Sequence, residues 1–361
     1  MLSLYGIYLS IYNYHVMIIK DFSSLISFIY ELNPSSIFIL ADSNTLQYCV
    51  PILITEVQKL KEAQILEVEP GEETKAIEIA SGLWESLVEQ NADRNSLLIN
   101  VGGGVVCDLG GFVAATYMRG INFINVPTSL LAMVDAGVGG KNGINLNQYK
   151  NLIGLFQEAN VSFLNVQFLS SLPISEIRSG FAEVVKHYLL EGEATFNKLL
   201  TINPFEINDW SEIVYENIQI KNNFVKDDLK EKGKRAALNL GHTVAHALEA
   251  LFLKKQSPIL HGDAVAAGIL IESHLATYCT QMFLKEASFK QIDQYIKKIF
   301  PPVVFHKSDI EEIIKFMRHD KKTNQASLTF SLLKWPGEVV LDYKSSEQQI
   351  VNSLIYYIDN V

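Results

Sequence analysis

Residues 96–111 read SLLINVGGGVVCDLGG, a short apolar run followed by three glycines and a second apolar stretch. Residues 96–101 are predicted to form a buried β-strand, and the residues after the glycines to open a helix. Glycines at such a turn let backbone N–H groups approach a pyrophosphate, and a helix N-terminus favours the anion. The segment departs from the GxGxxG fingerprint, because Cys107 stands at the third glycine and no acidic residue follows about 20 positions later. Taken alone, it fits dinucleotide binding and a tight structural turn equally well.

Strands and helices alternate on both sides of this segment. Residues 36–41 and 122–126 read as further buried strands, and residues 74–89 carry apolar side chains at helical spacing. Strands that alternate with helices predict a parallel sheet whose two faces are covered. From about Leu172 onward helical patterns follow one another, over residues 175–190, 210–226, 239–253, 263–282 and 308–319. We therefore predict an α/β domain that ends near Pro173 and a mainly α-helical domain after it.

The size and composition of the chain fit two domains. Its 361 residues exceed what one core usually organises. Apolar residues make up 48% and charged residues 19%, which excludes a disordered chain. Lys and Arg number 30 against 40 Asp and Glu, a formal net charge of −10, and so acidic a chain is not expected to bind nucleic acid. Any phosphate that it binds needs a local cluster of bases.

Cysteine usage and hydropathy indicate a soluble cytoplasmic protein without a membrane partner. Cys49, Cys107 and Cys279 form no CxxC pair, which fits a reducing compartment and excludes a disulfide scaffold and a thiolate zinc site. Residues 2–19 are apolar but lack a basic start and a cleavage site, so paired strands are expected there rather than a signal peptide. No segment offers the roughly 20 uninterrupted apolar residues that a membrane span needs.

A histidine-rich segment reads GHTVAHALE over residues 241–249. His242 and His246 share one helical face, a spacing able to bind one divalent ion, and His261 follows shortly. The alternative is a capped helix with partly buried imidazoles. Glu183 and Lys186 lie one helical turn apart among apolar neighbours, either as a surface ion pair or as a buried functional pair.

Several basic residues and one acidic residue stand next to turns. The Gly-rich segment 134–143 contains Lys141 and lacks the GK[ST] ending of a P-loop, although such a loop can hold phosphate. Asp42, at the end of a predicted strand, is a candidate for a ribose contact. Each isolated base fits a solvated surface charge, and only as a set do they suggest an anion site: Arg119, Lys221, Arg235, Lys321 and Lys322.

Taken in order, these segments resemble the 3-dehydroquinate synthase family, the cyclases of the shikimate pathway. The matching blocks run from about residue 42 to 322 and include residues 70–75, 102–112, 117–120, 126–131, 134–143, 150–154, 179–186, 238–249, 261–265 and 320–322. The resemblance implies a Rossmann-like, NAD-binding α/β domain over residues 1–173 and a mainly α-helical metal- and substrate-binding domain over residues 174–361. It also implies an active site in the cleft between them, and a homodimer, the family's frequent state.

The resemblance also implies the site residues. One Zn²⁺ or Co²⁺ ion is expected on Glu183, His242 and His261, so that the two histidines of the helical pair do not chelate one ion together. Substrate contacts carried over from the family are Arg119, Asp135, Lys141, Asn151, Lys186, Lys221, Arg235, Asn239, His246 and Lys321, with catalytic roles for Lys141, Lys186, Arg235, Asn239 and His246. NAD contacts carried over are Asp42, Gly71, Glu72, Lys75, Gly103, Gly104, Val105, Val106, Asp108, Thr128, Ser129, Lys141, Lys150, Phe168, Leu169, Ser170 and Ser171.

The implied enzyme is a phosphate-eliminating lyase. It would convert 3-deoxy-D-arabino-heptulosonate 7-phosphate to 3-dehydroquinate and phosphate, by transient NAD-dependent oxidation, phosphate elimination, re-reduction and intramolecular aldol cyclisation. Compared with the family pattern, the chain has other residues at Ser129, Met133, Gly137, Asn142, Asn165, Ala245 and Asp263. None of these departures removes an implied metal ligand or cationic contact.

Two alternatives share the two-domain plan. Cyclases acting on sedoheptulose 7-phosphate usually lose the second histidine of the GHxxxH block, whereas His246 is present here, and cyclases acting on glucose 6-phosphate form a related group. Metal-dependent glycerol and alcohol dehydrogenases carry a GGGSxxDxAK loop, which differs from GGGVVCDLGG at residues 102–111. A net NADH product would identify a dehydrogenase, since a cyclase regenerates NAD in each cycle.

Overall fold

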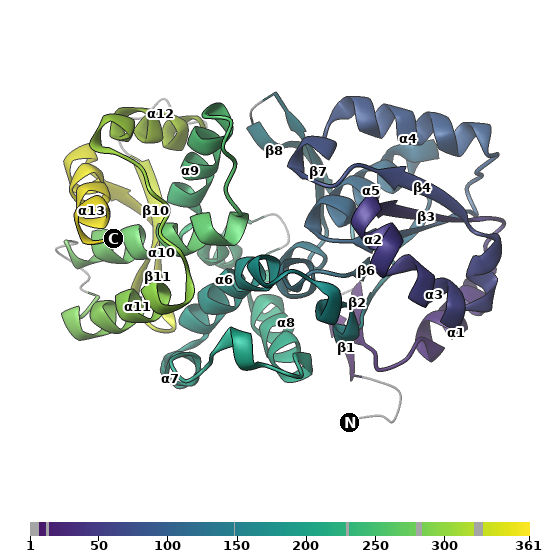
Figure 1. Cartoon of the computed structure of the whole chain (residues 1–361), viewed down its shortest axis with the longest axis horizontal. Coiled ribbons are helices and arrows are strands. Elements are labelled where there is room, and N and C mark those ends of the chain that lie inside the picture. The colour runs from purple at the N-terminus through teal and green to yellow at the C-terminus, as the bar shows by residue number, and fades with distance from the viewer. Residues whose placement is uncertain (1–6, 12–13, 148, 229–230, 279–283, 321–327) are drawn as a thin grey trace. The chain divides into compact units, whose positions relative to one another are not determined.

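The protein was analysed as a computed structural model that describes residues 7–11, 14–147, 149–228, 231–278, 284–320 and 328–361 (Figure 1). The chain folds into two compact units. The first unit comprises residues 1–173 and 209–218, and the second comprises residues 174–208 and 219–361. The short segment 209–218 thus belongs to the first unit, although it follows the start of the second along the chain.

The first unit is built on a seven-stranded sheet in the order β1-β2-β9-β6-β5-β3-β4. β1 and β2 pair antiparallel, as expected for the apolar N-terminal stretch, and the other neighbours pair parallel. The strands are β1 Ile7–Ile11, β2 Tyr14–Ile18, β3 Ile37–Asp42, β4 Gln64–Val68, β5 Leu97–Gly102, β6 Asn122–Pro127 and β9 Val161–Leu164. The parallel core confirms the predicted α/β class, because β5 is buried along its whole length, as a strand covered on both faces must be.

Helices and one hairpin complete the first unit. α5 packs on β5 and β6, and α4 contacts β4. The longer elements are α1 Ser23–Leu32, α2 Ser43–Tyr48, α3 Val50–Glu56, α4 Ile77–Glu89, α5 Gly104–Thr116 and the antiparallel hairpin of β7 Lys141–Leu146 and β8 Tyr149–Phe156. The short turns are η1 Gln58–Glu62, η2 Glu72–Thr74, η3 Tyr117–Arg119, η4 Ala132–Ala136 and η5 Val166–Ser171.

The second unit is mainly helical, as predicted. Its helices are α6 Ile174–Glu191, α7 Glu193–Leu199, α8 Ser211–Val225 (which begins in the segment assigned to the first unit), α9 His242–Lys254, α10 His261–Thr277, α11 Glu286–Ile299, α12 Ile310–Asp320 and α13 Glu347–Asn360. Three short turns are η6 Pro204–Glu206, η7 Lys234–Asn239 and η8 Lys307–Asp309. An antiparallel hairpin of β10 Leu328–Trp335 and β11 Glu338–Ser345 was not expected from the sequence.

Two glycines let three helices of this unit approach closely. A Cβ atom on Gly262 in α10 would lie 2.0 Å from the carbonyl oxygen of Ser179 in α6, and one on Gly268 would lie 2.0 Å from that of Gly241. Glu272 of α10 also accepts hydrogen bonds from the backbone N–H groups of Gly241 (2.7 Å) and Val244 (3.2 Å). These contacts hold the first turns of α9 and α10 at fixed positions against α6.

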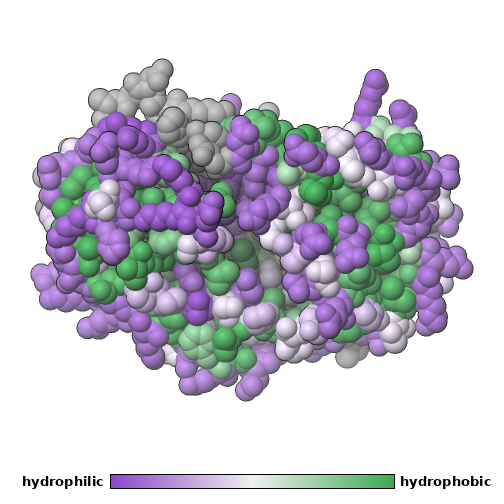
Figure 2. Space-filling model, turned by 45° about the horizontal axis from the view of Figure 1, so that its top comes forward, coloured by the Kyte–Doolittle hydropathy of each residue, from purple (hydrophilic) through white to green (hydrophobic). Residues whose placement is uncertain are grey.

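Hydrophilic residues lie over much of the surface, with apolar residues in patches between them (Figure 2). Cys49 and Cys107 are buried free thiols, and Cys279 lies outside the described residues. Within the described part of the chain, none of the helices combines the length and apolar character that crossing a bilayer requires.

His274 of α10 is expected to make the stability of the fold depend on pH. Its ring stacks on Tyr356 of α13 with centroids 3.8 Å apart, and its Nδ1 lies 3.2 Å from Ser353 Oγ. Burial lowers the pKa of His274 from 6.5 to about 4. As the pH falls, His274 therefore becomes protonated near pH 6.5 in the unfolded chain but only near pH 4 in the folded chain. The free energy of unfolding is thus highest above about pH 6.5 and falls as the pH drops towards about 4.

Urea unfolding at several pH values checks this expectation. His274→Phe retains an aromatic ring against Tyr356 and removes the titration, so its free energy of unfolding should fall less between about pH 7 and pH 4 than that of the unsubstituted chain. Because the carboxylates titrate alike in both proteins, their contribution to the pH dependence cancels when the two proteins are compared. Equal slopes for the two proteins would contradict the expectation.

Candidate active site

Three helices of the second unit bring one carboxylate and two imidazoles together. Glu183 lies in the middle of α6, His242 opens α9 and His261 opens α10. Glu183 Oε1 lies 3.3 Å from His242 Nε2 and 3.4 Å from His261 Nε2, and one donor atom from each of the three residues lies within 4.8 Å of the other two. Glu183 is completely buried, whereas the side chains of His242 and His261 keep 12% and 26% of their area exposed. The arrangement joins residues far apart in the sequence into one group of metal-type donors.

His246 follows His242 by one turn of α9 but is not part of this donor group. The His242 and His246 rings meet edge to face, with centroids 5.5 Å apart. The spacing of the two histidines thus correctly indicates a shared helical face, while the partners of His242 among metal-type donors come from α6 and α10.

The two histidines beside Glu183 differ in their pKa. Burial and the Lys186 ammonium lower the pKa of His242, and Glu183 only partly opposes them. Burial acts in the same direction on His261, but Glu249 and Glu183 outweigh it and raise the pKa of His261 to about 10. Burial raises the pKa of Glu183, yet Lys186 and His242 hold it well below its usual value. Glu183 is therefore an ionised carboxylate inside the unit.

Lys186 forms a buried ion pair with Glu183, one turn earlier on α6. Only 2% of the Lys186 side chain is exposed. The pair is thus buried, as the apolar neighbours in the sequence suggested. A buried carboxylate and ammonium are rarely retained without a partner or a function.

In the first unit, the Gly-rich segment links β5 to α5. Gly103 is the N-cap residue of α5, and no side chain caps this helix. The Gly102 carbonyl accepts a hydrogen bond from Thr128 N (3.0 Å), which joins the turn to the end of β6. An uncapped N-terminus at the carboxyl end of a central parallel strand can bind an anion.

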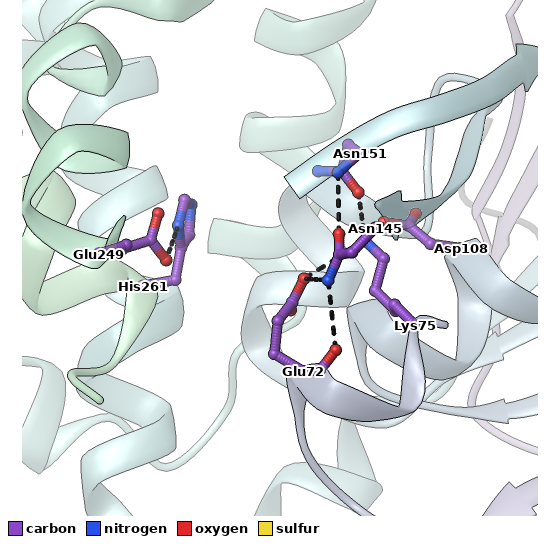
Figure 3. Close-up of polar contacts among 7 residues, drawn as sticks. All are labelled: Glu72, Lys75, Asp108, Asn145, Asn151, Glu249 and His261. Atoms are coloured by element: carbon purple, nitrogen blue, oxygen red, sulfur yellow. Dashed lines mark hydrogen bonds and ion pairs between the residues drawn. The ribbon is translucent and has the colours of Figure 1, made fainter. Parts of the chain in front are cut away.

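Lys75 organises polar residues near this turn (Figure 3). Its ammonium lies 2.7 Å from Asp108 Oδ2 on α5, donates to Asn151 Oδ1 on β8, and lies 3.8 Å from Glu72 Oε1. Lys75 is 3% exposed, so the charge is held almost wholly inside the protein. Burial lowers the pKa of Lys75, but Asp108 and Glu72 raise it above its ordinary value. Burial raises the pKa of Asp108 against the effect of the Lys75 ammonium.

Comparison with known proteins shows the family to which the chain with this geometry belongs. Residues 65–179 match the family model for the 3-dehydroquinate synthase N-terminal region, and residues 180–323 match that for the C-terminal region. A 3-dehydroquinate synthase from Parabacteroides distasonis is 39% identical over 345 residues, which cover 95% of this chain and 97% of that one. The chain belongs to the 3-dehydroquinate synthase family. The family expected from the ordered sequence blocks is thereby confirmed.

Solved structures similar to this 3-dehydroquinate synthase family member confirm its fold. A 2-deoxy-scyllo-inosose synthase, solved with carbaglucose-6-phosphate, NAD⁺ and Co²⁺, superposes with a TM-score of 0.84 at 23% identity and covers 99% of this chain and 100% of its own. A 2-epi-5-epi-valiolone synthase from Streptomyces hygroscopicus, with NAD⁺ and Zn²⁺ bound, has a TM-score of 0.84 at 20% identity and covers 98% and 99%.

The cationic and amide residues expected to bind substrate in the synthase family lie in both units. In the second unit Lys221 of α8 and Arg235 of η7 are buried, Asn239 ends η7, and His246 lies on α9. Asp228 accepts hydrogen bonds from Lys232 N, Gly233 N and Arg235 N, at 2.8, 2.7 and 3.0 Å, and so shapes the turn that carries Arg235. Lys321 lies outside the described residues.

The expected substrate residues of the first unit lie on short turns and on the β7–β8 hairpin. Arg119 ends η3 with φ 69°, and Asp135 lies in η4, a turn of π-helix. Lys141 opens β7, and Asn151 lies on β8 with φ 51°. Asn151 accepts a hydrogen bond from Lys75, so a residue expected to contact substrate is hydrogen-bonded to a residue expected to contact NAD.

Several expected NAD residues already have a role in the fold. Asp42 caps α2 by accepting from Thr45 N (2.8 Å), and the side chains of Phe168 and Leu169 are buried, which leaves only their backbone for a ligand. Gly71, at φ 117°, is the N-cap of η2, the turn that carries Glu72. The remaining expected residues follow β6 or lie on α5, β8 and η5: Gly104, Val105, Val106, Thr128, Ser129, Lys150, Ser170 and Ser171.

Three polar residues of the two sites were not singled out in the sequence. Asn145 of β7 donates from Nδ2 to Glu72 Oε1 (2.9 Å) and accepts at Oδ1 from Asn151 N (2.8 Å), which joins the hairpin to η2. Glu231 Oε1 accepts from Asn239 Nδ2 (2.5 Å), and Glu249 Oε1 lies 3.3 Å from His261 Nδ1. No spacing pattern marks such residues, because their partners come from other elements.

Several departures from the family pattern have a local explanation. A Cβ atom on Gly137 would lie 2.7 Å from the Ala132 carbonyl oxygen, so η4 is too tight for a larger residue there. Asn142 donates to the Gln157 carbonyl (2.6 Å), and Asp263 forms a two-pronged ion pair with Arg178 at 3.0 Å for each bond. These side chains serve local contacts, and none of them belongs to the Glu183 donor group.

Proposed function

We propose that this chain converts 3-deoxy-D-arabino-heptulosonate 7-phosphate to 3-dehydroquinate and phosphate, with NAD and a divalent metal ion. The observation that carries the proposal is the Glu183–His242–His261 donor group in a chain of the 3-dehydroquinate synthase family. In this proposal the first unit binds NAD, and the second unit binds the metal ion and much of the substrate.

The chemistry of the donor group fits Zn²⁺ or Co²⁺. Both carboxylate oxygens of Glu183 are buried and, among the described residues, accept no hydrogen bond of good geometry, although charged neighbours surround them. One carboxylate and two imidazoles are the donor types of catalytic zinc sites, in which three protein ligands leave a position open. Glu183, His242 and His261 would hold the ion.

The first unit has features that fit NAD. The uncapped N-terminus of α5 suits the pyrophosphate, and Gly103, Gly104 and Val105 would present backbone N–H groups to it. The Glu72–Lys75–Asp108 group offers charged and hydrogen-bonding atoms on the adjoining turn and on α5. When bound, NAD supplies reversible oxidation at the substrate's C5 hydroxyl, and the metal ion lowers the pKa of coordinated hydroxyls.

The chain's own residues would neutralise the charges of the substrate, orient one of its hydroxyls and exchange protons with it. Lys221 and Arg235 are buried cations, which suit the carboxylate and the phosphate of the substrate. His246 would exchange a proton through its imidazole, and Asn239, held by Glu231, would orient a hydroxyl. Lys186 lies beside Glu183 and would donate a hydrogen bond from Nζ. The departing phosphate can itself take up the proton, so no strong protein base is needed.

Phosphate release tests the proposal. The purified protein is expected to release phosphate from 3-deoxy-D-arabino-heptulosonate 7-phosphate with catalytic NAD⁺, without net NADH, and to lose the activity on addition of a chelator. Sedoheptulose 7-phosphate and glucose 6-phosphate serve as controls and are expected to release none. Release from a control sugar phosphate alone would move the substrate assignment to another cyclase, and net NADH with an alcohol substrate would favour a dehydrogenase.

We further propose that the protein acts as a homodimer in the cytoplasm. Membership of the 3-dehydroquinate synthase family and the two buried free thiols, Cys49 and Cys107, support this assignment. Sedimentation equilibrium at enzymatic concentrations tests the dimer, because a mass near that of one 40.5 kDa chain would contradict it.

A further inference from the structure

Glu249 is a buried carboxylate that the proposed chemistry does not use. It lies on α9 two turns after His242, and its side chain is 3% exposed. A carboxylate so well removed from water carries a large desolvation penalty unless it serves a partner. Its nearby partner is an imidazole: Glu249 Oε1 lies 3.3 Å from His261 Nδ1 (Figure 3).

The two nitrogens of His261 face two different carboxylates. Nδ1 faces Glu249, while Nε2 lies 3.4 Å from Glu183 Oε1 in the donor group. A hydrogen bond from Nδ1–H to Glu249 sets the rotation of the ring, so that Nε2 faces the donor group and offers its lone pair once a metal ion displaces the Nε2 proton. Carboxylates that accept from the second nitrogen of a ligating histidine recur in metal sites and strengthen metal binding.

α9 therefore contacts the donor group twice. Its first residue, His242, is a direct member, and Glu249 touches the other histidine from the same helix. The negative charge of Glu249 also adds to that of Glu183, which favours a divalent cation nearby.

From this geometry we infer that Glu249 is a positioning residue of the metal site, which orients His261 for metal binding through Nδ1. The inference rests on the proposed metal site but assigns a new residue to it. Glu249 is not itself a member of the donor group and is not expected to touch substrate or NAD.

Metal affinity tests the inference without recourse to activity. The dissociation constant of Co²⁺ is measured by competition with a chelator at one pH, without NAD or substrate, and the visible spectrum of the bound Co²⁺ is recorded. Glu249→Ala is expected to weaken Co²⁺ binding about 10- to 100-fold and to change the spectrum. Glu249→Gln, which keeps one acceptor oxygen without the charge, is expected to fall between Glu249→Ala and the unsubstituted protein.

A matched control separates positioning from stability. Leu251→Val alters a buried residue of the same helix that belongs to no polar contact of the site, so it should lower stability while leaving Co²⁺ affinity and spectrum unchanged. Unchanged Co²⁺ affinity in folded Glu249→Ala would overturn the inference and leave the proposed function intact. An equal loss of affinity in Leu251→Val would also overturn it, and absence of Co²⁺ binding in the unsubstituted protein would instead overturn the metal site itself.

Discussion

Replacing His261 by alanine is expected to abolish stoichiometric binding of Zn²⁺ or Co²⁺ and to lower phosphate release at least about a thousandfold. The donor group would keep only Glu183 and His242, and two protein ligands hold such an ion weakly. His261 is the most suitable of the three for the test, because its side chain is 26% exposed and its loss opens little of the core. Glu183→Ala, by contrast, would leave the Lys186 ammonium buried without its carboxylate.

Elemental analysis of the dialysed protein and a phosphate-release assay measure the two effects, and circular dichroism verifies the fold. His306→Ala is the matched control, since His306 is an exposed histidine of the second unit outside the donor group. It should bind metal and react as the unsubstituted protein does. A folded His261→Ala protein with one metal ion per chain and full activity would show that the ligand assignment is wrong.

Replacing Lys75 by methionine is expected to lower the free energy of unfolding by about 3–5 kcal/mol and to weaken NAD binding strongly. The Lys75 ammonium forms an ion pair with Asp108 at 2.7 Å, and it also donates to Asn151. Without it, Asp108 has no compensating charge in the interior of the first unit and must either stay ionised at a high desolvation cost or take up a proton. The hairpin also loses a contact with the turn that carries Glu72.

Urea unfolding and calorimetric titration with NAD⁺ measure these two effects. Lys75→Met combined with Asp108→Leu removes both charges, so it should recover part of the lost stability without recovering NAD affinity. Lys61→Met, at an exposed lysine of the same unit, is the control and should change neither quantity. If Lys75→Met kept the stability and NAD affinity of the unsubstituted protein, the role given to the ion pairs of Lys75 with Asp108 and Glu72 would be wrong.

The elements that could be predicted from sequence are those with an uninterrupted local signal. The strands predicted at 36–41, 96–101 and 122–126 are found at Ile37–Asp42, Leu97–Gly102 and Asn122–Pro127, because strands of a covered parallel sheet are apolar on both faces. The helix expected from residue 74 begins at Ile77 instead. Lys75 leaves helical geometry, with ψ 53°, where its side chain enters the ion pair with Asp108.

The spacing of residues in the sequence could not by itself predict contacts between elements that are distant along the chain. Helical periodicity relates His242 to His246, yet the carboxylate beside His242 lies on α6, and the carboxylate beside His261 Nδ1 lies two turns along α9. The hairpin of β10 and β11 was missed for a related reason, since its pairing depends on residues that meet only after the chain turns back. The order of the family blocks predicted the grouping of Glu183, His242 and His261, which periodicity could not.

The close approach of Gly262 to Ser179 and of Gly268 to Gly241 has a consequence for how the metal ion arrives. Glu183, His242 and His261 lie on three helices whose close packing forms when the chain folds, so the proposed ligands of the metal ion are brought together before any ion is present. The conformational entropy of assembling the site is then lost once, during folding, and not at each binding event. We therefore expect such a site to bind and release a metal ion without unfolding of the three helices.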